Sequence, residues 1–399
     1  PQAVTLSSTY SYNTAGRLIT SAHSAPASLA LPSGWSLSDT IGANSMGYAY
    51  DTNGNRTQAH YTIQTLAGTA TEKRTEQTAS GTNRLQSHSH TYTPAGSSAS
   101  QTTTQDYPRD ASGSLTRLGS QTLQYNAQGR IAAATTAGAS TPAFSYQYNS
   151  SAQRLLKTDL RQGTTATATT STEATLYADD ATGSTVLGQY SNLRSTNSAA
   201  PAGEADSTEV LWLPTASGPM PIAAQINGRL YAIDSDHLNT LRRLTNTQGQ
   251  VVWQWLITGY GEVAPTTGAT GYAFEAPQLG GSSNTSGNVY SEEVNFKLRY
   301  PGQVWDDETG LSYNLNRYYD GQAGRYIQSD PIGLDGGWNR FGYVSGNPLN
   351  GIDPQGLYES SPWLRAWVPG QVSFDRGMTA LENGNYGAAA LSFGTMLGE

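Results

Sequence analysis

Two copies of one short pattern, Asp-Pro-x-Gly-Leu, lie close together toward the end of the chain. The first begins at Asp330 and the second at Asp353, so the two carboxylates are 23 positions apart. Proline biases the preceding residue toward extended backbone and glycine permits a sharp turn, so each copy predicts a rigid corner that presents its carboxylate. If the corners meet, the carboxylates share one proton, and one can act as a base on water while the other acts as an acid on an amide.

The doubled pattern has two interpretations. In the first, the pair is an aspartic protease that cuts its own chain once, because a peptide bond held beside the carboxylates needs no diffusional encounter. In the second, Asp-Pro-x-Gly is simply a stable turn, as it is in most proteins. From spacing alone, the second interpretation is favoured.

Other residues with chemical potential form weaker patterns. His88 and His90 would point to one strand face, which suits a metal, but no matching carboxylate or cysteine cluster accompanies them, so exposed histidines are expected. Residues 306–308, Asp-Asp-Glu, are expected to form a solvated turn. No G-x-S-x-G elbow, phosphate-binding loop or zinc spacing occurs in the sequence, so no metal or cofactor is expected.

The composition predicts that strands and turns position these residues. Charged residues are 13% of the 399, while Gly (43) and Tyr (24) are abundant, and this mixture favours strands and turns over helices. The net charge of −8 does not suggest a nucleic-acid-binding surface. Cysteine is absent, which excludes disulfides and thiolate chemistry, and no apolar run reaches the roughly 18 residues of a membrane span.

One turn pattern recurs along the chain: Tyr, then Asn or Asp, two variable residues, Gly, and Arg or Asn. Copies occur at 12–17, 50–56, 110–113, 125–130, 148–154, 179–183 and 319–325. Asn or Asp accepts backbone hydrogen bonds, and Gly takes the left-handed conformation of a type I turn with a G1 bulge. Each copy therefore predicts a hairpin, with aromatic residues such as Phe144 and Tyr146 on one face. A single hairpin cannot bury that face, so a stacked array is predicted.

The composition changes after Leu357, which predicts a domain boundary there. Residues 1–229 are assigned to the repeat array, 230–357 to a second region with the two corners, and 358–399 to a segment of different character. Short helices are expected at 373–383 and 386–397. Because the chain starts without Met and ends within an apolar stretch, a fragment of a longer polypeptide is expected.

These motifs resemble the Rhs (rearrangement hot spot) family. The hairpin pattern is similar to its YD repeat. Asp236-His237-Leu238, the hairpin at 246–253, the Tyr-Pro-Gly-Gln at 300–303 and the stretch 316–357 resemble its Rhs repeat-associated core, in the family's order. The core resemblance covers 230–357, and the looser repeat resemblance covers the remainder back to residue 1. Asn239 and Leu241 depart from it, because the family often has Gly and Pro there.

The resemblance implies an all-β fold, in which YD-repeat hairpins form a spiralling shell, or cocoon, with an inward-folded C-terminal plug and a short α-helical toxin segment after it. It also implies that Asp330 and Asp353 are the proteolytic pair and that the bond cut is Leu357–Tyr358. The corner residues would support the pair: Pro331, Gly333, Pro354 and Gly356. Arg325 would orient a carboxylate or form a structural salt bridge, and both readings stay open.

The function implied is that of an Rhs-type polymorphic toxin effector in interbacterial competition. It would be made in the bacterial cytoplasm and delivered to a target cell, by type VI secretion in the favoured reading. Its partners would be its own C-terminal toxin, a secretion apparatus, a chaperone and an immunity protein, with a membrane role limited to the toxin segment. Two alternatives stay open: a toxin-complex C subunit that encloses a toxin with a B subunit, and a non-cleaving cell-surface YD-repeat protein for adhesion or contact. The sequence gives no motif for the activity of the toxin itself.

Overall fold

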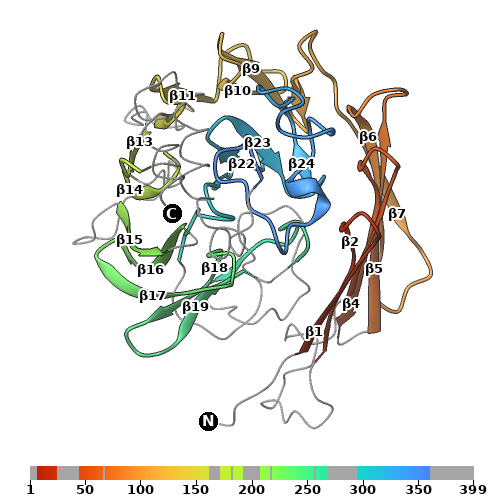
Figure 1. Ribbon diagram of the computed structural model, residues 1–399, viewed down its shortest axis with the longest axis horizontal. Coiled ribbons are helices and arrows are strands. Elements are labelled where there is room, and N and C mark those ends of the chain that lie inside the picture. The colour runs from red at the N-terminus through yellow and green to blue at the C-terminus, as the bar shows by residue number, and fades with distance from the viewer. Residues whose placement is uncertain are drawn as a thin grey trace, which may run out of the picture. The chain divides into compact units, whose positions relative to one another are not determined.

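The computed structural model describes residues 7–24, 45–65, 68–160, 171–180, 183–191, 207–215, 218–255, 258–267 and 294–359. Across these ranges the regular elements are β-strands, apart from one 3₁₀ turn at Val344–Gly346 (Figure 1). The predicted all-β class is therefore confirmed, whereas the helices expected at 373–383 and 386–397 lie outside the described residues. Within these ranges, no helix has the length and apolar character that crossing a membrane requires.

The chain divides into two compact units, each assembled from separate stretches of sequence. The first unit comprises residues 1–119, 249–297 and 319–349, and the second comprises 120–248, 298–318 and 350–399. Each unit thus combines hairpins of the repeat region with segments of the core region. The sequence boundaries predicted at 229/230 and 357/358 stay predictions.

The first unit is built on an antiparallel sheet whose seven strands are neighbours in chain order and are coloured red to orange in Figure 1. They are β1 (Ser7–Tyr12), β2 (Leu18–Ser24), β3 (Ser45–Tyr50), β4 (Arg56–Thr65), β5 (Gly68–Thr78), β6 (Leu85–Thr93) and β7 (Gln101–Asp106). The unit also contains β8 (Arg117–Leu118), β19 (Val251–Gln254), β20 (Thr266–Thr267) and β24 (Arg325–Tyr326). Its sheet packs against later segments in a core that joins Leu18, Tyr48 and Tyr61 to Tyr260 and Leu349.

The second unit continues the same plan, with antiparallel strands again in chain order and coloured yellow to green in Figure 1. These are β9 (Gln121–Tyr125), β10 (Ile131–Thr136), β11 (Phe144–Tyr148), β12 (Arg154–Asp159), β13 (Ser171–Tyr177), β14 (Val186–Tyr190), β15 (Ser207–Thr215), β16 (Gly218–Ile226), β17 (Arg229–Ser235) and β18 (Leu241–Asn246). A later hairpin, β21 (Val304–Asp306) and β22 (Leu311–Asn314), pairs Val304 with Tyr313. Strand β23 (Arg317–Asp320) contains the boundary between the units.

The repeat forms the predicted turn. In the first copy the Gly16 N–H donates to the Asn13 carbonyl at 2.9 Å, and Gly16 has a φ of +76°. The bulge after the turn makes Tyr12 face Leu18. In the copy at 148–154, Ala152 takes the glycine position with a φ of +68°. The copy at 319–325 differs, because its turn runs from Gly321 to Gly324, with an N···O distance of 3.2 Å.

The residue opposite the repeat tyrosine is buried in every copy whose bulge the structure defines. It is Leu18, Arg56, Ile131, Arg154 or Val186, exposed by 0, 4, 0, 2 and 3% respectively. The predicted aromatic face is confirmed, because Phe144 and Tyr146 are each only 4% exposed. The repeat arginine therefore enters the interior of its unit in two of these five copies.

Candidate self-cleavage site

The second Asp-Pro-x-Gly-Leu corner is folded as a repeat turn. The Gly356 N–H points at the Asp353 carbonyl at 3.4 Å, and Gly356 has a φ of +67°. The Leu357 N–H donates to Asp353 Oδ1 at 2.9 Å. In the repeat, Arg130 N–H donates to Asn126 Oδ1 in the same way at 3.0 Å. The candidate catalytic aspartate thus occupies the capping position of the turn.

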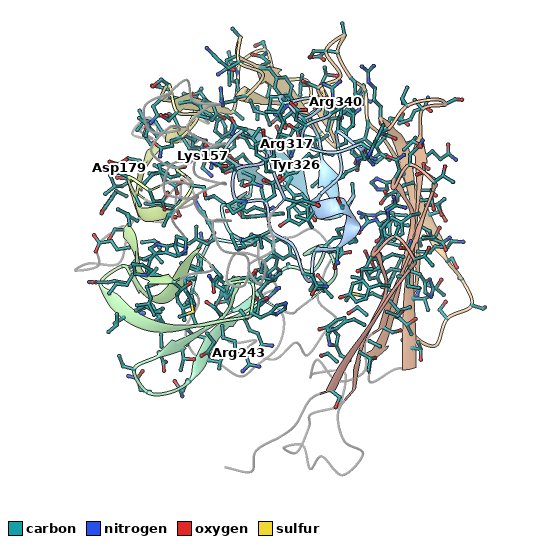
Figure 2. The ribbon with its side chains drawn as sticks, in the orientation of Figure 1. Lys157, Asp179, Arg243, Arg317, Tyr326 and Arg340 are labelled. Carbon is teal, nitrogen blue, oxygen red and sulfur yellow. The ribbon has the colours of Figure 1, made fainter. Side chains whose placement is uncertain are left out.

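Arg317 ties this corner to the core region of the second unit. Its Nη2 donates to Asp353 Oδ2 at 3.1 Å, and its Nε donates to the Gly356 carbonyl at 2.5 Å. Both charged side chains are only 3% exposed. Asn314 Nδ2 adds a bond to the Asp353 carbonyl at 2.9 Å. Arg317, labelled in Figure 2, therefore holds the carboxylate on one side and the backbone before Leu357 on the other.

Two glycines, Gly302 and Gly356, let the second corner lie close to the neighbouring backbone. Gly302 has a φ of +82°, and a Cβ there would lie 2.0 Å from the Pro354 carbonyl oxygen. A Cβ on Gly356 would lie 2.5 Å from the Asn314 carbonyl oxygen. Since both distances are far below van der Waals contact, any larger residue would push the second corner away from Arg317.

The first corner also forms the predicted turn, inside the first unit. The Gly333 N–H donates to the Asp330 carbonyl at 3.1 Å, and the Ile332 N–H donates to Asp330 Oδ1 at 3.1 Å. Gly333 has a φ of +71°, while its missing side chain faces open space, so the backbone conformation alone requires glycine. Arg340 contributes its carbonyl to the Asp330 N–H at 2.8 Å.

Both predicted catalytic aspartates are buried, at 1% exposure for Asp330 and 3% for Asp353. Asp330 belongs to the first unit and Asp353 to the second. Their juxtaposition stays a prediction. Leu357 is buried and Tyr358 is half-buried, both at the end of the second corner.

Arg325, the proposed supporting residue, makes contacts of another kind. Its Nη2 donates to the Asn83 carbonyl, and its guanidinium stacks over the Phe341 ring at 5.4 Å. Burial lowers its pKa to about 10. These contacts fasten the strand to its unit. The residue that the sequence did not point to is Arg317, whose bonds reach across 36 and 39 positions.

The expectation of a solvated turn at residues 306–308 holds for Asp307, which is exposed in a turn, but is wrong for Asp306 and Glu308. Asp306 is fully buried and accepts hydrogen bonds from both Nη atoms of Arg154, one of them at 2.8 Å, and from Lys157 Nζ at 3.1 Å. Burial opposes the charge of Asp306, but the two cations outweigh it and lower its pKa. Glu308 binds Lys157 at 3.2 Å, and there burial prevails and raises the pKa. Arg154 and Lys157 lie about 150 positions earlier on β12, so the local sequence could not reveal these partners.

The expectation of exposed histidines is also wrong for His88. Its side chain is 9% exposed, and its Nδ1 lies 2.9 Å from the Tyr107 hydroxyl. Burial lowers the His88 pKa to about 3, so it is neutral near pH 7. His90 is half-buried and lies 3.3 Å from Glu72. The two histidines thus serve different local networks.

Curated relatives share part of the chain, whereas no family model matches it. The chain is 49% identical over 82 residues (21% of the chain) to "Probable deoxyribonuclease RhsA" of Dickeya dadantii. It is 33% identical over 161 residues (39%) to "Toxin protein Tse5" of Pseudomonas aeruginosa. It is also 33% identical over 136 residues (34%) to "Double-stranded DNA deaminase toxin A" of Burkholderia cenocepacia. These likenesses support an Rhs/YD-repeat polymorphic toxin family for the chain.

The Rhs/YD-repeat chain spans only a small part of these relatives, 6% of RhsA, 10% of Tse5 and 8% of the deaminase toxin. Its fold is similar to that in the crystal structure of TcdB2-TccC3-Cdc42, with a TM-score of 0.55 and 18% identity. That likeness covers 88% of this chain and 17% of the other. It confirms the predicted β-shell class of fold.

Proposed function

We propose that this Rhs/YD-repeat chain carries the autoprotease of a polymorphic toxin effector, and that it cuts itself at Leu357–Tyr358 to release the segment that follows. The observation that carries the proposal is the second corner. There the buried carboxylate of Asp353 accepts a hydrogen bond from the Leu357 N–H at 2.9 Å and another from Arg317 at 3.1 Å. A carboxylate is thereby held next to the residue that precedes the proposed cleavage point.

In the proposed reaction one water molecule adds across the Leu357–Tyr358 amide. Asp353 takes a proton from the water as its oxygen attacks the Leu357 carbonyl carbon. The hydrogen bond from Arg317 Nη2 to Asp353 Oδ2 supports this role, because a guanidinium stabilises an ionised carboxylate. Asp330, protonated, gives its proton to the Tyr358 nitrogen as the C–N bond breaks. The products are a carboxyl group on Leu357 and an amino group on Tyr358.

The rest of the proposal concerns the role of cleavage in a delivered toxin. The array of residues 1–357 would enclose the toxin segment that starts at Tyr358 and shield it from the producing cell, and pairing strands in a closed array also removes exposed edges. The relatives named as toxins support this reading. The partners would be the enclosed toxin, a secretion apparatus, with type VI secretion as the favoured route, a chaperone and an immunity protein. The target would be a rival bacterial cell.

The test compares the wild-type chain with Asp330→Asn and Asp353→Asn on a denaturing gel, with mass spectrometry of the fragments. Wild type is expected to yield a fragment ending at Leu357 and another beginning at Tyr358, and both variants are expected to stay whole. Asparagine already caps the same turn at Asn126, so Asp353→Asn should keep the turn while it removes the charge that faces Arg317.

A matched control is available at Asp236. It caps an equivalent turn through the Thr240 N–H at 3.0 Å, and its Oδ2 binds Arg242 at 2.8 Å. Asp236→Asn changes the same kind of charge at a turn with no proposed chemistry, and it should leave cleavage intact. A wild-type chain that stays as one band with both aspartates present would sink the proposal and favour the non-cleaving surface protein.

A second candidate function is that of a toxin-complex C subunit, which needs a B subunit to complete its enclosure. The likeness of fold to the TcdB2-TccC3-Cdc42 crystal structure over 88% of this chain favours it. Co-expression with the B-type chain encoded nearest to this one, followed by size-exclusion chromatography, separates the two. A stable complex supports the C-subunit reading, whereas a chain that retains its cleaved segment alone supports the self-sufficient effector.

A further inference from the structure

Arg130, an arginine of one repeat turn, contacts Asn316, a residue that holds the second Asp-Pro-x-Gly-Leu corner. Arg130 ends the turn that begins at Asn126, just before β10. Its Nη2 donates to Asn316 Oδ1 at 2.9 Å. Asn316 in turn holds the corner, because its Nδ2 and its backbone N–H both donate to the Gln355 carbonyl, at 3.1 and 3.2 Å. All of these residues belong to the second unit.

The order of donors and acceptors along this path gives Arg130 a specific role. An asparagine amide can present either its oxygen or its NH₂ group in a given direction, but arginine only donates hydrogen bonds. Arg130 therefore fixes the oxygen of Asn316 on its own side and leaves the NH₂ group facing the Gln355 carbonyl. Without Arg130, the amide loses one of the two side-chain hydrogen bonds that hold it, and only the Gln355 carbonyl still orients it.

The two residues that hold the corner, Asn316 and Arg317, are adjacent in sequence. Asn316 precedes Arg317, which binds Asp353 Oδ2 and the Gly356 carbonyl. A shift of Asn316 would therefore move the guanidinium that orients the carboxylate. Small displacements matter for a reaction that depends on geometry, since a misplacement of about 1 Å can cost about 100-fold in rate.

We propose that Arg130 is a positioning residue for self-cleavage, acting through Asn316 on the corner at Asp353–Leu357. The inference rests on the proposed autoprotease function. It has a consequence for timing: the corner is complete only after the hairpin of β9 and β10 has docked on the core segment. Cleavage would then follow the folding of this part of the array, and a chain with an unfinished array would keep its toxin segment attached.

The experiment follows cleavage of the full chain during cell-free synthesis, with samples taken over time. Arg130→Ala is expected to cleave at least about tenfold more slowly than wild type. Arg130→Lys should recover part of the rate, because lysine also only donates hydrogen bonds. The double variant Arg130→Ala/Asn316→Ala should be no slower than Asn316→Ala alone, because both changes break one path.

Gln153 provides a matched control at the same position of the next turn. Its N–H donates to Asn149 Oδ1 at 3.0 Å, but its side chain binds the Gly183 carbonyl of the array at 2.9 Å. Gln153→Ala should cleave at the wild-type rate. Unfolding of Arg130→Ala is measured in the uncleavable Asp353→Asn background, so that a general loss of fold can be recognised. If Arg130→Ala does not fold, the cleavage rate of Asn316→Asp tests the proposal instead. This variant keeps an acceptor for Arg130 but has no side-chain donor for the Gln355 carbonyl.

The outcomes separate the inference from the proposed function. Cleavage of Arg130→Ala or of Asn316→Asp at the wild-type rate, with wild type cleaving, overturns the positioning role and leaves the autoprotease standing. Equal slowing in Gln153→Ala also overturns it, because the effect would then belong to the array in general. A wild-type chain that does not cleave overturns both.

Discussion

At the scale of single residues, one side-chain position of the turn serves both structure and proposed chemistry. The N–H four residues on is accepted at 3.0 Å by Asn126, at 2.8 Å by Asp51 and at 2.9 Å by Asp353. Asn and Asp thus cap the turn equally well, and the cap itself does not require a charge. At Asp353 the second carboxylate oxygen accepts a hydrogen bond from Arg317, so the charge has a role that capping the turn does not require.

Arg317→Lys tests whether the clamp needs the guanidinium fork. Lysine keeps the charge but cannot hold Asp353 and the Gly356 carbonyl with two fixed donors. We expect cleavage to slow by about 10- to 100-fold, the effect of losing a hydrogen bond to a charged group. The rate is measured by gel densitometry during synthesis. Arg242→Lys, at the equivalent pair with Asp236, is the control and should cleave normally; slowing there to the same degree would contradict the prediction.

The sequence could predict the residues whose role is local. A Pro before a variable residue and Gly requires a particular turn, so the corners at Asp330 and Asp353 were predictable from five letters each. Arg317 was not, because its partners lie 36 and 39 positions away and an arginine beside tyrosines has many uses. Asp306 was mistaken for a solvated residue for the same reason, since its neutralising cations belong to β12.

At the scale of elements, the second corner depends on close backbone contact with the loop that contains Gly302. Gly302→Ala would place a Cβ 2.0 Å from the Pro354 carbonyl oxygen. Gly228 has nearly the same φ, +83° against +82°, but nothing lies within 4 Å of its missing Cβ. Gly228→Ala should cost only the left-handed backbone penalty of about 1–2 kcal/mol and should cleave normally.

Gly302→Ala should cost more than this control and should abolish cleavage, because either Pro354 or the loop must move. Urea unfolding of both variants in the Asp353→Asn background measures the difference, and gels of the cleavable forms measure the activity. Equal stabilities, together with normal cleavage in Gly302→Ala, would show that the contact is not needed.

The hairpin of β21 and β22 is anchored to the array by a buried ionic cluster. Asp306→Asn should destabilise the second unit by about 3–5 kcal/mol, because it leaves Arg154 and Lys157 buried without their shared counter-charge. Glu308→Gln should cost about 1 kcal/mol, since burial already raises the pKa of Glu308 and makes its charge unfavourable. Denaturant unfolding of the two variants at pH 7 checks this order.

The same cluster predicts opposite responses to acid. Asp306 has a lowered pKa, so its contribution is complete above its ordinary value of 3.8 and is lost as the pH falls through the folded value. Glu308 has a raised pKa, so it takes up a proton more readily in the folded state, and acidification toward its ordinary value of 4.5 favours folding at this site. On acidification from pH 7 to pH 4.5, wild type should therefore gain stability relative to Glu308→Gln, and a relative loss would contradict this assignment.

At the scale of the whole molecule, each unit joins early repeat hairpins to late core segments. Arg56 of the first unit binds Glu76 on the neighbouring strand and also Glu262, 206 positions later. Arg154 of the second unit binds Asp306, 152 positions later. The repeat turns were predictable because they are local, whereas the assembly of the units rests on long-range partners that a single sequence does not reveal.

This architecture leads to a last prediction, that cleavage occurs within one chain. Asp353 belongs to the same turn as the residue whose carbonyl is attacked, so the reaction is unimolecular and its half-time should not change with protein concentration. The measurement is a dilution series over about 100-fold in concentration, together with a mixture of wild type and tagged Asp353→Asn chains. The tagged chain should stay whole throughout, because its own corner lacks the carboxylate and the burial of wild-type Asp353, 3% exposed, keeps another chain from reaching it. Cleavage of the tagged chain, or a half-time that falls as the protein is concentrated, would mean that the site accepts a peptide from outside and would overturn the cis mechanism.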